Sequence, residues 1–357
     1  MKRLLKAVLI LVAAVMLAFA GFVAVVSITD YRPAPVEDVD VDNQRSGVLD
    51  ADREFAITTF NIGYCGLDKE TDFFMDGGTM SRAISKEHVL ASLDGVLRFL
   101  QGANSDFFFI QEIDRRSTRS YNVDEYDAVT KSVPEYAASF AANYKVGWVP
   151  VPVMRPHGRV LGGLATLSRF EAARSRRFSL PGVYSWPTQL FMLDRCLLES
   201  RIPLTSGREL VLAHLHLEAY DKGGTIRDQQ LGFVKDYAEA ELEKGNYVVI
   251  GGDWNHMLSE NAEEKRAAAG DSWPSWLQTL PDDFTPDGYA WAYDESTPSN
   301  RGVDAPYDPG RSFLVTIDGF LVSNNIEIVS VHGHDLGFEY SDHNPVTAVL
   351  KLKERSH

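Results

Sequence analysis

The sequence has little cysteine: Cys65 and Cys196 are the only two in 357 residues. Two cysteines cannot build the disulfide framework of a small secreted domain, and no cysteine cluster is present that would indicate a zinc site. We therefore expect two buried thiols. The chain also lacks a self-similar period, which excludes a repeat protein.

Motifs of several large enzyme classes are missing as well. The chain contains no G-x-S-x-G, no Walker phosphate loop and no G-x-G-x-x-G. Nothing in it indicates a serine hydrolase elbow, a P-loop nucleotidase or a dinucleotide-binding domain.

Basic residues are outnumbered, with 35 Lys and Arg against 50 Asp and Glu and a formal net charge of −15. This balance argues against broad electrostatic binding of nucleic acid, although it leaves room for a basic pocket. The chain is 45% hydrophobic, 24% charged and 11% aromatic, which excludes a disordered, collagen-like or coiled-coil protein. Its length fits a few average domains or one large α/β or β-sandwich domain.

The amino terminus has the composition of a membrane segment. Three basic residues, Lys2, Arg3 and Lys6, precede the 22 uncharged residues from Ala7 to Ile28. A helix needs about 20 such residues to cross the hydrocarbon core, and the positive charges place the N-terminus inside and the body outside. A cleaved signal peptide, with Ala18-Phe19-Ala20 as the cleavage site, is the alternative, but its apolar region usually has only about 7–15 residues. We therefore expect an uncleaved signal anchor, and an exported body in either case.

We divide the chain into a signal anchor at residues 1–28, a linker at residues 29–53 and one domain at residues 54–353. The linker combines Arg-Pro-Ala-Pro with the run Glu-Asp-Val-Asp-Val-Asp, and proline with like charges favours an extended, solvated spacer. Removing residues 1–28 takes away three basic residues and no acidic one, so the net charge changes from −15 to −18.

Strand and helix patterns fill the domain. The predicted strands are residues 54–61, 106–110, 145–153, 162–168, 195–203, 209–217, 247–250, 313–322, 327–332 and 345–352. Helical periodicity predicts a helix from a Ser85 cap to Gln101, and we expect others at residues 134–143 and 225–244, the last with a capping-box-like start at Thr225 and Asp228. A long irregular stretch follows at residues 257–311. Helices among many strands, without strict βαβ repetition, predict two packed sheets with helices outside.

Short polar clusters follow the apolar strands at the points where these end. They are Thr59-Phe60-Asn61, Gln111-Glu112, His214-Leu215-His216, Asp253-Trp254-Asn255, Asp318 and Ser341-Asp342-His343. Strand ends on a rigid scaffold commonly present catalytic groups. Carboxylate and amide oxygens favour a hard cation such as Mg²⁺ or Mn²⁺, and carboxylates and histidines can move protons. Each cluster alone also fits a turn, a cap or an exposed strand end, but the whole series is poorly explained by chance.

These clusters resemble the motifs of the endonuclease/exonuclease/phosphatase superfamily, which has the deoxyribonuclease-I-like fold. The similarity runs from Glu54 to Leu352 and is most specific in Gly-Asp-Trp-Asn and Ser-Asp-His. It implies an α/β fold: a four-layer α/β/β/α sandwich of two mixed, mostly antiparallel sheets, here preceded by an N-terminal transmembrane helix. It also implies divalent-metal-dependent hydrolysis of a phosphoester. Further segments, such as residues 162–168 and 304–307, are similar to one bacterial branch of the superfamily.

The resemblance implies roles for individual side chains. Asn61 and Glu112 would help hold the metal, expected to be Mg²⁺ or Mn²⁺, and Asp342 would lie near it. Asp253 would orient or deprotonate the attacking water. Asn255 would contact the phosphoryl group in the transition state, which positioned charges and donors stabilise.

It also implies roles for histidines. His343 would contact the scissile phosphate while Asp318 accepts its other N–H and fixes the tautomer. His216 matches the histidine of the family's Asn-x-His-Leu segment, as a phosphate contact or general acid. His214 stands where that segment usually has Asn, and it shares a strand face with His216. His214 either replaces the amide as a donor or forms a second metal site, and we favour the donor because two ligands make a poor metal site.

Three arginines, Arg119, Arg195 and Arg301, are candidate phosphate contacts because the guanidinium group suits phosphate geometry. A structural or surface role is the more common one for an arginine. For each arginine, both roles, a phosphate contact and a structural or surface residue, therefore stay open at the level of the sequence.

The sequence therefore predicts an exported phosphoesterase that acts on a small molecule or a lipid head group. A nuclease that acts on DNA or RNA is the alternative, and a non-catalytic binding module on the same fold is a further one, opposed by the presence of Glu112, Asp253 and His343. We expect a monomer with no strong nucleic-acid binding. It should sit in the cell membrane as a single-pass protein with the catalytic domain extracytoplasmic, or be secreted if the anchor is cleaved.

Overall fold

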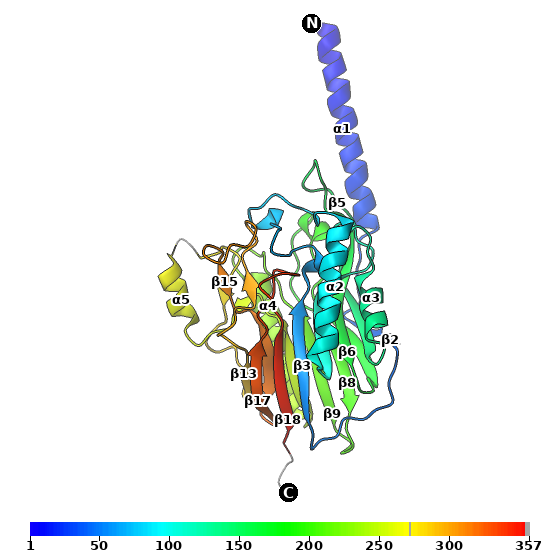
Figure 1. The fold of residues 1–357 in the computed structure, drawn as a ribbon. Coiled ribbons are helices and arrows are strands. Elements are labelled where there is room, and N and C mark those ends of the chain that lie inside the picture. Colours follow the sequence, from blue (N-terminus) through cyan, green and yellow to red (C-terminus); the bar gives the residue numbers. More distant parts are fainter. Residues whose placement is uncertain (271–272, 354–357) are drawn as a thin grey trace.

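The computed structural model describes residues 1–270 and 273–353, which form two packed seven-stranded sheets (Figure 1). The first sheet has the order β1 (Val36–Val39), β7 (Arg174–Ser179), β8 (Cys196–Pro203), β9 (Glu209–His216), β10 (Tyr247–Asp253), β16 (Asp318–Ser323) and β13 (Tyr289–Ala292). The second has the order β17 (Ile326–Gly333), β18 (Val346–Leu352), β3 (Glu54–Asn61), β4 (Phe107–Asp114), β6 (Gly158–Ser168), β5 (Ala137–Val149) and β2 (Val41–Asp42). Within the two sheets, the pairs β9–β10 and β3–β4 are parallel and the other pairs are antiparallel.

Five α-helices and several short elements complete the described chain. The helices are α1 (Lys2–Ile28), α2 (Lys86–Ala103), α3 (Glu125–Ser132), α4 (Thr225–Glu243) and α5 (Ala262–Ala269). Single 3₁₀ turns are η1 (Gly63–Cys65), η2 (Phe74–Asp76) and η3 (Thr188–Phe191). Two small ladders pair β11 (His256–Met257) with β12 (Gln278–Thr279) and β14 (Asn300–Arg301) with β15 (Leu314–Val315).

The apolar residues sort into the layers of a sandwich. Between the sheets, Phe55 and Phe109 of one face pack with Leu212 and Phe320 of the other. Outside the second sheet, α2 and α3 pack on β3, β4 and β6, and outside the first sheet α4 packs on β8, β9 and β10. The predicted four-layer α/β/β/α sandwich is confirmed.

Local signals explain α2, whereas α4 begins differently from the prediction. Ser85 Oγ accepts a hydrogen bond from His88 N–H at 3.2 Å, as expected of an N-cap. Thr225 does not cap α4. The N-cap is Gly224, and the carboxylate of Asp221 accepts from the backbone N–H of Ile226 at 2.7 Å. An acceptor from the preceding loop satisfies the free amides of the first turn equally well.

The helix predicted at residues 134–143 is wrong. The helix lies earlier, at α3, where Asp124 caps it by accepting from Asp127 N–H at 3.0 Å, and residues 137–149 form β5. Alanines favour a helix in isolation, but Ala137 to Val149 pair with β6 along their whole length. Ladder pairing with a distant strand therefore outweighs local propensity here.

The segment expected to be a solvated linker contributes to both sheets. β1 pairs with β7 at the edge of the first sheet, and β2 pairs with β5 at the edge of the second. Its charges remain compatible with an edge, since Asp38 forms an ion pair with Arg174 at 2.8 Å. Charged side chains on short edge strands also discourage pairing with other molecules.

Helix α1 projects from one end of the sandwich, and β18, the last described strand, ends at the opposite end (Figure 1). It has 27 residues, a mean hydropathy of 2.9 over its apolar window and no buried residue in that window. By length and composition it can cross a membrane, although a signal sequence passes the same test.

Candidate active site

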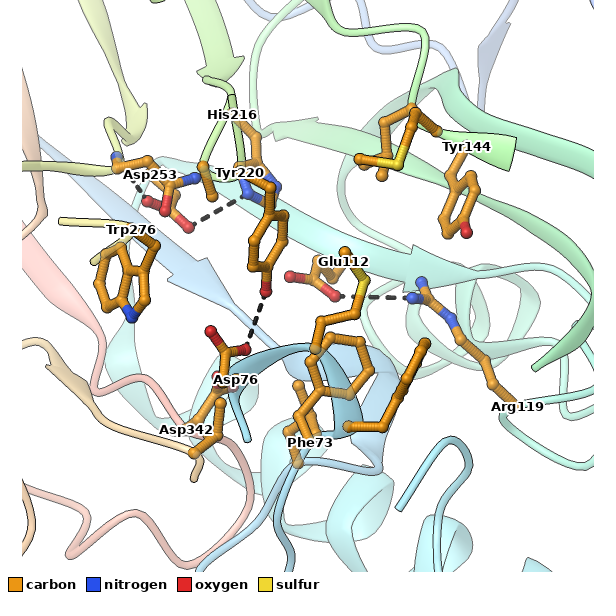
Figure 2. A pocket seen from close by; sticks show the side chains of 18 of the residues that line it. Phe73, Asp76, Glu112, Arg119, Tyr144, His216, Tyr220, Asp253, Trp276 and Asp342 are labelled. Atoms are coloured by element: carbon orange, nitrogen blue, oxygen red, sulfur yellow. Dashed lines mark hydrogen bonds and ion pairs between the residues drawn. The ribbon is translucent and has the colours of Figure 1, made fainter. Parts of the chain in front are cut away.

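The strand register brings the predicted polar residues together at one end of the sandwich. Asp253, the last residue of β10, is in register with His216 on β9 and with Asp318 on β16. On the facing sheet, Asn61 ends β3 beside β4, which carries Glu112. Because these positions are strand ends, the side chains meet where the two sheets part. Figure 2 shows several of them around one pocket.

The carboxylate of Asp253 is the centre of this group. Its Oδ2 lies 3.3 Å from Nε2 of His216 and 3.7 Å from Nε2 of His343, and Asn61 Nδ2 donates to it at 3.0 Å. Burial raises the pKa of Asp253 to about 7, although the nearby His343 opposes the shift. A carboxylate with this pKa can exchange a proton with water near neutral pH.

The backbone around Asp253 leaves its side chain little freedom. Gly252 has φ +134°, and a Cβ there would lie 2.0 Å from the carbonyl oxygen of Leu215, so only glycine fits. Trp254 is fully buried and donates from Nε1 to the carbonyl of Gly319 at 3.1 Å. The backbone N–H of Asn255 donates to Asp253 Oδ1 at 2.9 Å. The motif is therefore a rigid mount that points the other oxygen, Oδ2, at the histidines.

His343 is held by a buried carboxylate. Its Nδ1 lies 2.8 Å from Asp318 Oδ2, which also accepts from Ser299 Oγ at 2.7 Å. Its Nε2 lies 2.9 Å from the side-chain amide of Asn300. Burial on its own lowers the pKa of an imidazole, but the charge and hydrogen bond of Asp318 outweigh it and raise the pKa of His343 to about 10. This raised pKa favours the cationic form of His343 at neutral pH.

His216 has the opposite electrostatic character. Burial, with Arg195 as the next cause, holds the pKa of His216 well below its usual range. The side chain lines the pocket, and its Nδ1 has no hydrogen-bond partner among the described residues. A neutral imidazole with a free nitrogen can accept or relay a proton.

Two of the predicted metal ligands, Glu112 and Asp342, line the same pocket, and Asn61 lies behind them with its Oδ1 accepting from Gly63 N–H at 3.0 Å. Asn61 Nδ2 donates to Glu112 Oε1 at 3.3 Å, and Glu112 and Asp342 both line the cavity. Burial raises the pKa of Asp342, His343 opposes this, and the negative charge of Glu112 adds to it. Two carboxylates that disfavour each other's charge, beside an amide, form an oxygen donor set that suits a hard cation. The residues present therefore fit a divalent metal.

Two backbone features aim these ligands. Glu112 has φ +50° and lies within a register shift of the β4–β6 ladder between Ile110 and Ile113. A bulge of this kind redirects a side chain out of the strand alternation. Gly63 has φ +49°, and a Cβ there would lie 2.8 Å from Asp342 Oδ1. A larger residue at position 63 would therefore displace the carboxylate of Asp342.

Asp253, Asp318 and His343 form a second cluster in which possible ligand atoms lie within 4.8 Å of one another. The Asp318 oxygen that faces this cluster already accepts hydrogen bonds from His343 and Ser299. The other oxygen of Asp318, Oδ1, is buried and has no hydrogen-bond partner among the described residues. Because Asp318 Oδ2 is paired with His343, the cluster fits a general-base and donor system.

The three candidate arginines differ in what their guanidinium groups contact. Arg119 forms an ion pair with Asp114 at 3.0 Å and lies 3.8 Å from Glu112, an interaction drawn in Figure 2. Arg195 donates to Glu218 at 3.3 Å. Both line the pocket, so both can meet a ligand there.

Arg301 lies at the pocket wall, but its guanidinium group is engaged elsewhere. It donates to backbone carbonyls, which are those of Gly302, Ala305, Leu67, Asp68 and Thr71. The structural reading of this arginine therefore applies: it ties together the loops beside the pocket. A phosphate contact would require it to give up those bonds.

His214 does not reach the pocket, so the prediction of a substrate contact is wrong. Its Nε2 lies 2.6 Å from Gln111 Nε2, and its Nδ1 lies 3.2 Å from Thr166 Oγ1. The ring stacks on Phe109 with 4.6 Å between centroids. Both His214 and His216 point between the sheets, but His214 is two residues farther from the strand end, where the facing sheet covers it. The stack and these contacts also leave no second metal site with His216.

One polar pair in the pocket has no signal in the sequence. Tyr220 donates from its hydroxyl to Asp76 Oδ2 at 2.9 Å, and Figure 2 shows this bond in the pocket. Burial raises the pKa of Asp76 to about 6, and the bond from Tyr220 opposes the shift. Asp76 comes from η2 and Tyr220 from the loop before α4, and neither segment has a periodic pattern. Only the tertiary structure brings them together.

Much of the remaining pocket wall is apolar. The apolar residues that line the cavity beside the polar groups include Phe73, Phe74, Val149, Val151 and Phe191.

The model of the endonuclease/exonuclease/phosphatase family matches residues 58–343, which include all the strand-end clusters. The chain belongs to the endonuclease/exonuclease/phosphatase family. Members of this family are phosphoester hydrolases.

Solved structures agree with this membership at the level of the fold. An endonuclease/exonuclease/phosphatase from Beutenbergia cavernae has a TM-score of 0.56 at 17% identity, covering 84% of this chain and 72% of its own. A family structure from Bacteroides vulgatus has a TM-score of 0.53 at 16% identity, covering 84% and 100%. The human Nocturnin catalytic domain has a TM-score of 0.52 at 16% identity, covering 88% and 98%. No curated protein sequence matches the chain.

Proposed function

We propose that this chain is a divalent-metal-dependent phosphoesterase that hydrolyses a phosphomonoester or phosphodiester, with a small molecule or a lipid head group as the favoured substrate. The observation that carries the proposal is the carboxylate of Asp253. It is buried, has a pKa raised to about 7, and lies beside His343 in the pocket. A base of this strength, next to a cationic donor, suits attack of water on a phosphate.

Each residue at the centre has a distinct task. Asp253 takes the proton from the attacking water, which approaches in line with the leaving group. His343 donates from Nε2 to a phosphoryl oxygen, and Asp318 keeps the ring charged and oriented. Asn255 contacts the phosphoryl group, and the neutral His216 serves as a phosphate contact or relays to the leaving group the proton that Asp253 has taken from the water. Positioned donors of this kind stabilise the charge of the transition state.

Asn61, Glu112 and Asp342 would hold the metal, Mg²⁺ or Mn²⁺. When bound, such an ion neutralises charge on a phosphoryl oxygen and helps to ionise a water. The carboxylates of Glu112 and Asp342 balance the charge of the ion. Arg119 and Arg195, whose guanidinium groups line the same pocket, would bind the substrate phosphate.

We also propose that α1 is a signal anchor that holds the domain on the outer side of the cell membrane as a monomer. The basic residues before the span and the apolar length of α1 support this orientation. The test is membrane fractionation followed by protease accessibility. A mature soluble chain that begins near Gly21 would instead identify a cleaved signal peptide.

The experiment for the activity is a substrate screen with the full chain in detergent. Nucleic acids, phospholipids and small phosphomonoesters are each offered with Mg²⁺, Mn²⁺ or Ca²⁺. The Asp253→Asn variant is the matched control, since it keeps the shape of the side chain and removes the base. Hydrolysis that needs metal and disappears in the variant supports the proposal. Equal hydrolysis by both proteins would reject the assigned site.

A nuclease is the second candidate, favoured by the family itself, which includes endonucleases and exonucleases. A net charge of −15 opposes it, because phosphate backbones bind to Lys and Arg. Submicromolar binding to duplex DNA at physiological salt, with a steep salt dependence, would favour the nuclease. No hydrolysis of any substrate class would favour a non-catalytic binding module.

A further inference from the structure

Two segments beside the pocket carry no charge at all. They are residues 146–154, which end β5 and enter the next loop, and residues 180–193, which lead into and through η3. Other uncharged runs of nine or more residues, such as residues 55–67 and 160–168, are almost entirely buried, whereas these two segments include exposed residues. Burying a charge in an apolar medium costs free energy. Because these segments carry no charged residue, they can enter such a medium without that cost.

The same two segments hold the most exposed large apolar side chains. Among the described residues beyond position 28, the four highest exposures of such side chains are those of Met154 at 94%, Val153 at 82%, Val183 at 78% and Trp186 at 62%. Scattered apolar residues on a surface need no explanation, but all four here lie on two neighbouring loops. The loops adjoin because Tyr144 of β5 donates from its hydroxyl to the carbonyl of Phe191 at 3.1 Å.

The second segment is in contact with the end of the membrane helix. Phe22 of α1 stacks on Phe191 with 6.3 Å between ring centroids and 8° between planes. Trp186 donates from Nε1 to Ser27 Oγ at 3.4 Å, and Val26 is only 8% exposed. The body therefore holds the last part of α1, from Phe22 onward.

The length of the helix places these contacts at membrane depth. The uncharged part of α1 that stands free of the body runs from Ala7 to Gly21, 15 residues. At about 1.5 Å per residue this part is roughly 22 Å long, which is short of a hydrocarbon core of about 30 Å. A helix that fills the core must therefore include residues from Phe22 onward. The loops that touch those residues then reach the bilayer as well.

We propose that residues 146–154 and 180–193 form a membrane-docking surface that inserts into the outer side of the bilayer crossed by α1. The occupant is the lipid itself, because the surface is continuous with a span that lies in lipid. Trp186 has the position of an interfacial tryptophan, with its indole N–H bonded at the end of the helix. The proposal rests on membrane insertion of α1 and goes beyond the catalytic part of the proposed function.

The pocket then opens at the membrane. Val149, Val151 and Phe191 belong to the docking segments and also line the cavity that holds Asp253 and Glu112. The apolar wall of the site is therefore continuous with the surface that enters the lipid. A substrate with an acyl chain could reach the polar centre without crossing water.

The test places a fluorescent label on each loop of the full-length chain in nanodiscs. The variants Met154→Cys and Val183→Cys are labelled in the folded state, in which the native Cys65 and Cys196 are fully buried. Ser206→Cys, at the exposed β8–β9 turn, is the matched control. The lipid is phosphatidylcholine with phosphatidylglycerol, and part of it carries a nitroxide quencher near the top of the acyl chain. This measurement does not depend on activity, so it fails separately from the proposed function.

We expect both loop labels to emit at shorter wavelength and to lose at least about half of their fluorescence to the quencher, because an interfacial segment sits roughly 5–10 Å into the headgroup and acyl boundary. The label at the Ser206→Cys position should lose none. Loop labels that behave like the control would overturn the proposal. A blue shift that appears only in discs holding two copies of the chain, without lipid quenching, would also overturn it and identify a second copy as the occupant.

Discussion

Asp318 Oδ2 lies 2.8 Å from Nδ1 of His343, and the two side chains are 1% and 4% exposed. Because Nδ1–H points to the carboxylate, the other ring nitrogen is directed into the pocket, 3.7 Å from Asp253 Oδ2. In the proposed mechanism, Asp318 sets the charge and direction of His343. Asp318 would then be a positioning residue rather than one that meets the substrate.

This pairing predicts overlapping effects of mutation. His343→Ala removes the donor and should lower kcat at least about a hundredfold, as loss of one preorganised donor typically does. Asp318→Ala in the His343→Ala background should cost little more, since residues that act as a unit are not additive. The measurement is a double-mutant cycle on kcat, with unfolding followed in parallel. Fully additive losses would leave the site in place but reject the pairing.

Asp253→Asn should affect the chemical step almost alone. Asparagine keeps the shape on the rigid mount made by Gly252 and Trp254, but it cannot take a proton at neutral pH. General bases typically contribute roughly 10²–10⁴-fold, so we expect kcat to fall at least about a hundredfold with an unchanged unfolding midpoint. A folded variant with near-normal kcat would show that another group activates the water.

Removal of the metal should abolish activity. The oxygen-rich set of Glu112 and Asp342 predicts loss of hydrolysis in EDTA and recovery with Mg²⁺ or Mn²⁺. Glu112→Gln should raise the Mg²⁺ concentration needed for half-maximal activity at least about tenfold, since even outer partners of a metal site have effects of that size. Glu87→Gln, at an exposed carboxylate on α2, is the charge-matched control. Full activity after rigorous chelation contradicts the mechanism.

The sequence predicted those parts of the fold that local signals determine. The Ser85 cap and the apolar period placed α2, and the apolar run of β10 led directly to Asp253. It missed the first part of β5, residues 137–144, and the edge strand β1, because pairing with a strand far along the chain decides their structure. These are non-local effects that local propensity does not report.

The candidate site was predictable because its residues follow strand ends in a fixed order. The sequence could not predict how deeply each of these side chains lies between the two sheets. His214 and His216 share a strand face, as the alternation requires, yet the facing sheet covers only His214. The Asp76–Tyr220 bond joins two irregular segments, and its formation depends on how the loops pack rather than on either segment alone.

His214→Ala should therefore reduce stability and leave substrate affinity unchanged. Its ring is fully buried, stacks on Phe109 and lies within hydrogen-bond distance of Gln111. The cavity and the unpaired amide should cost about 2–5 kcal/mol of unfolding free energy. His216→Ala, two residues along the same strand, is the matched comparison and should lower kcat instead. A raised KM in folded His214→Ala would restore a role in binding.

A final prediction concerns stability at acid pH and the buried His256. Its Nδ1 lies 2.7 Å from the carbonyl oxygen of Trp254, and the side chain is 1% exposed. Burial lowers the pKa of His256 to about 4, and Arg227 adds to the shift while the carbonyl opposes it. In the unfolded chain the ordinary value of about 6.5 returns. The unfolded state therefore takes up a proton first as the pH falls.

The sign follows from this difference. Stability from His256 is complete above about pH 6.5 and is lost as the pH falls from there to about 4, where the folded state is protonated too; over that window the loss is roughly 3 kcal/mol. His256→Gln removes the titration. The unfolding free energy of this variant relative to the wild type should therefore rise steadily as the pH falls from about 6.5 to about 4. Urea unfolding of both proteins at several pH values measures it. His332→Gln, at an exposed histidine, is the matched substitution control. A constant difference between wild type and His256→Gln across the window would mean that folding does not lower the pKa of His256.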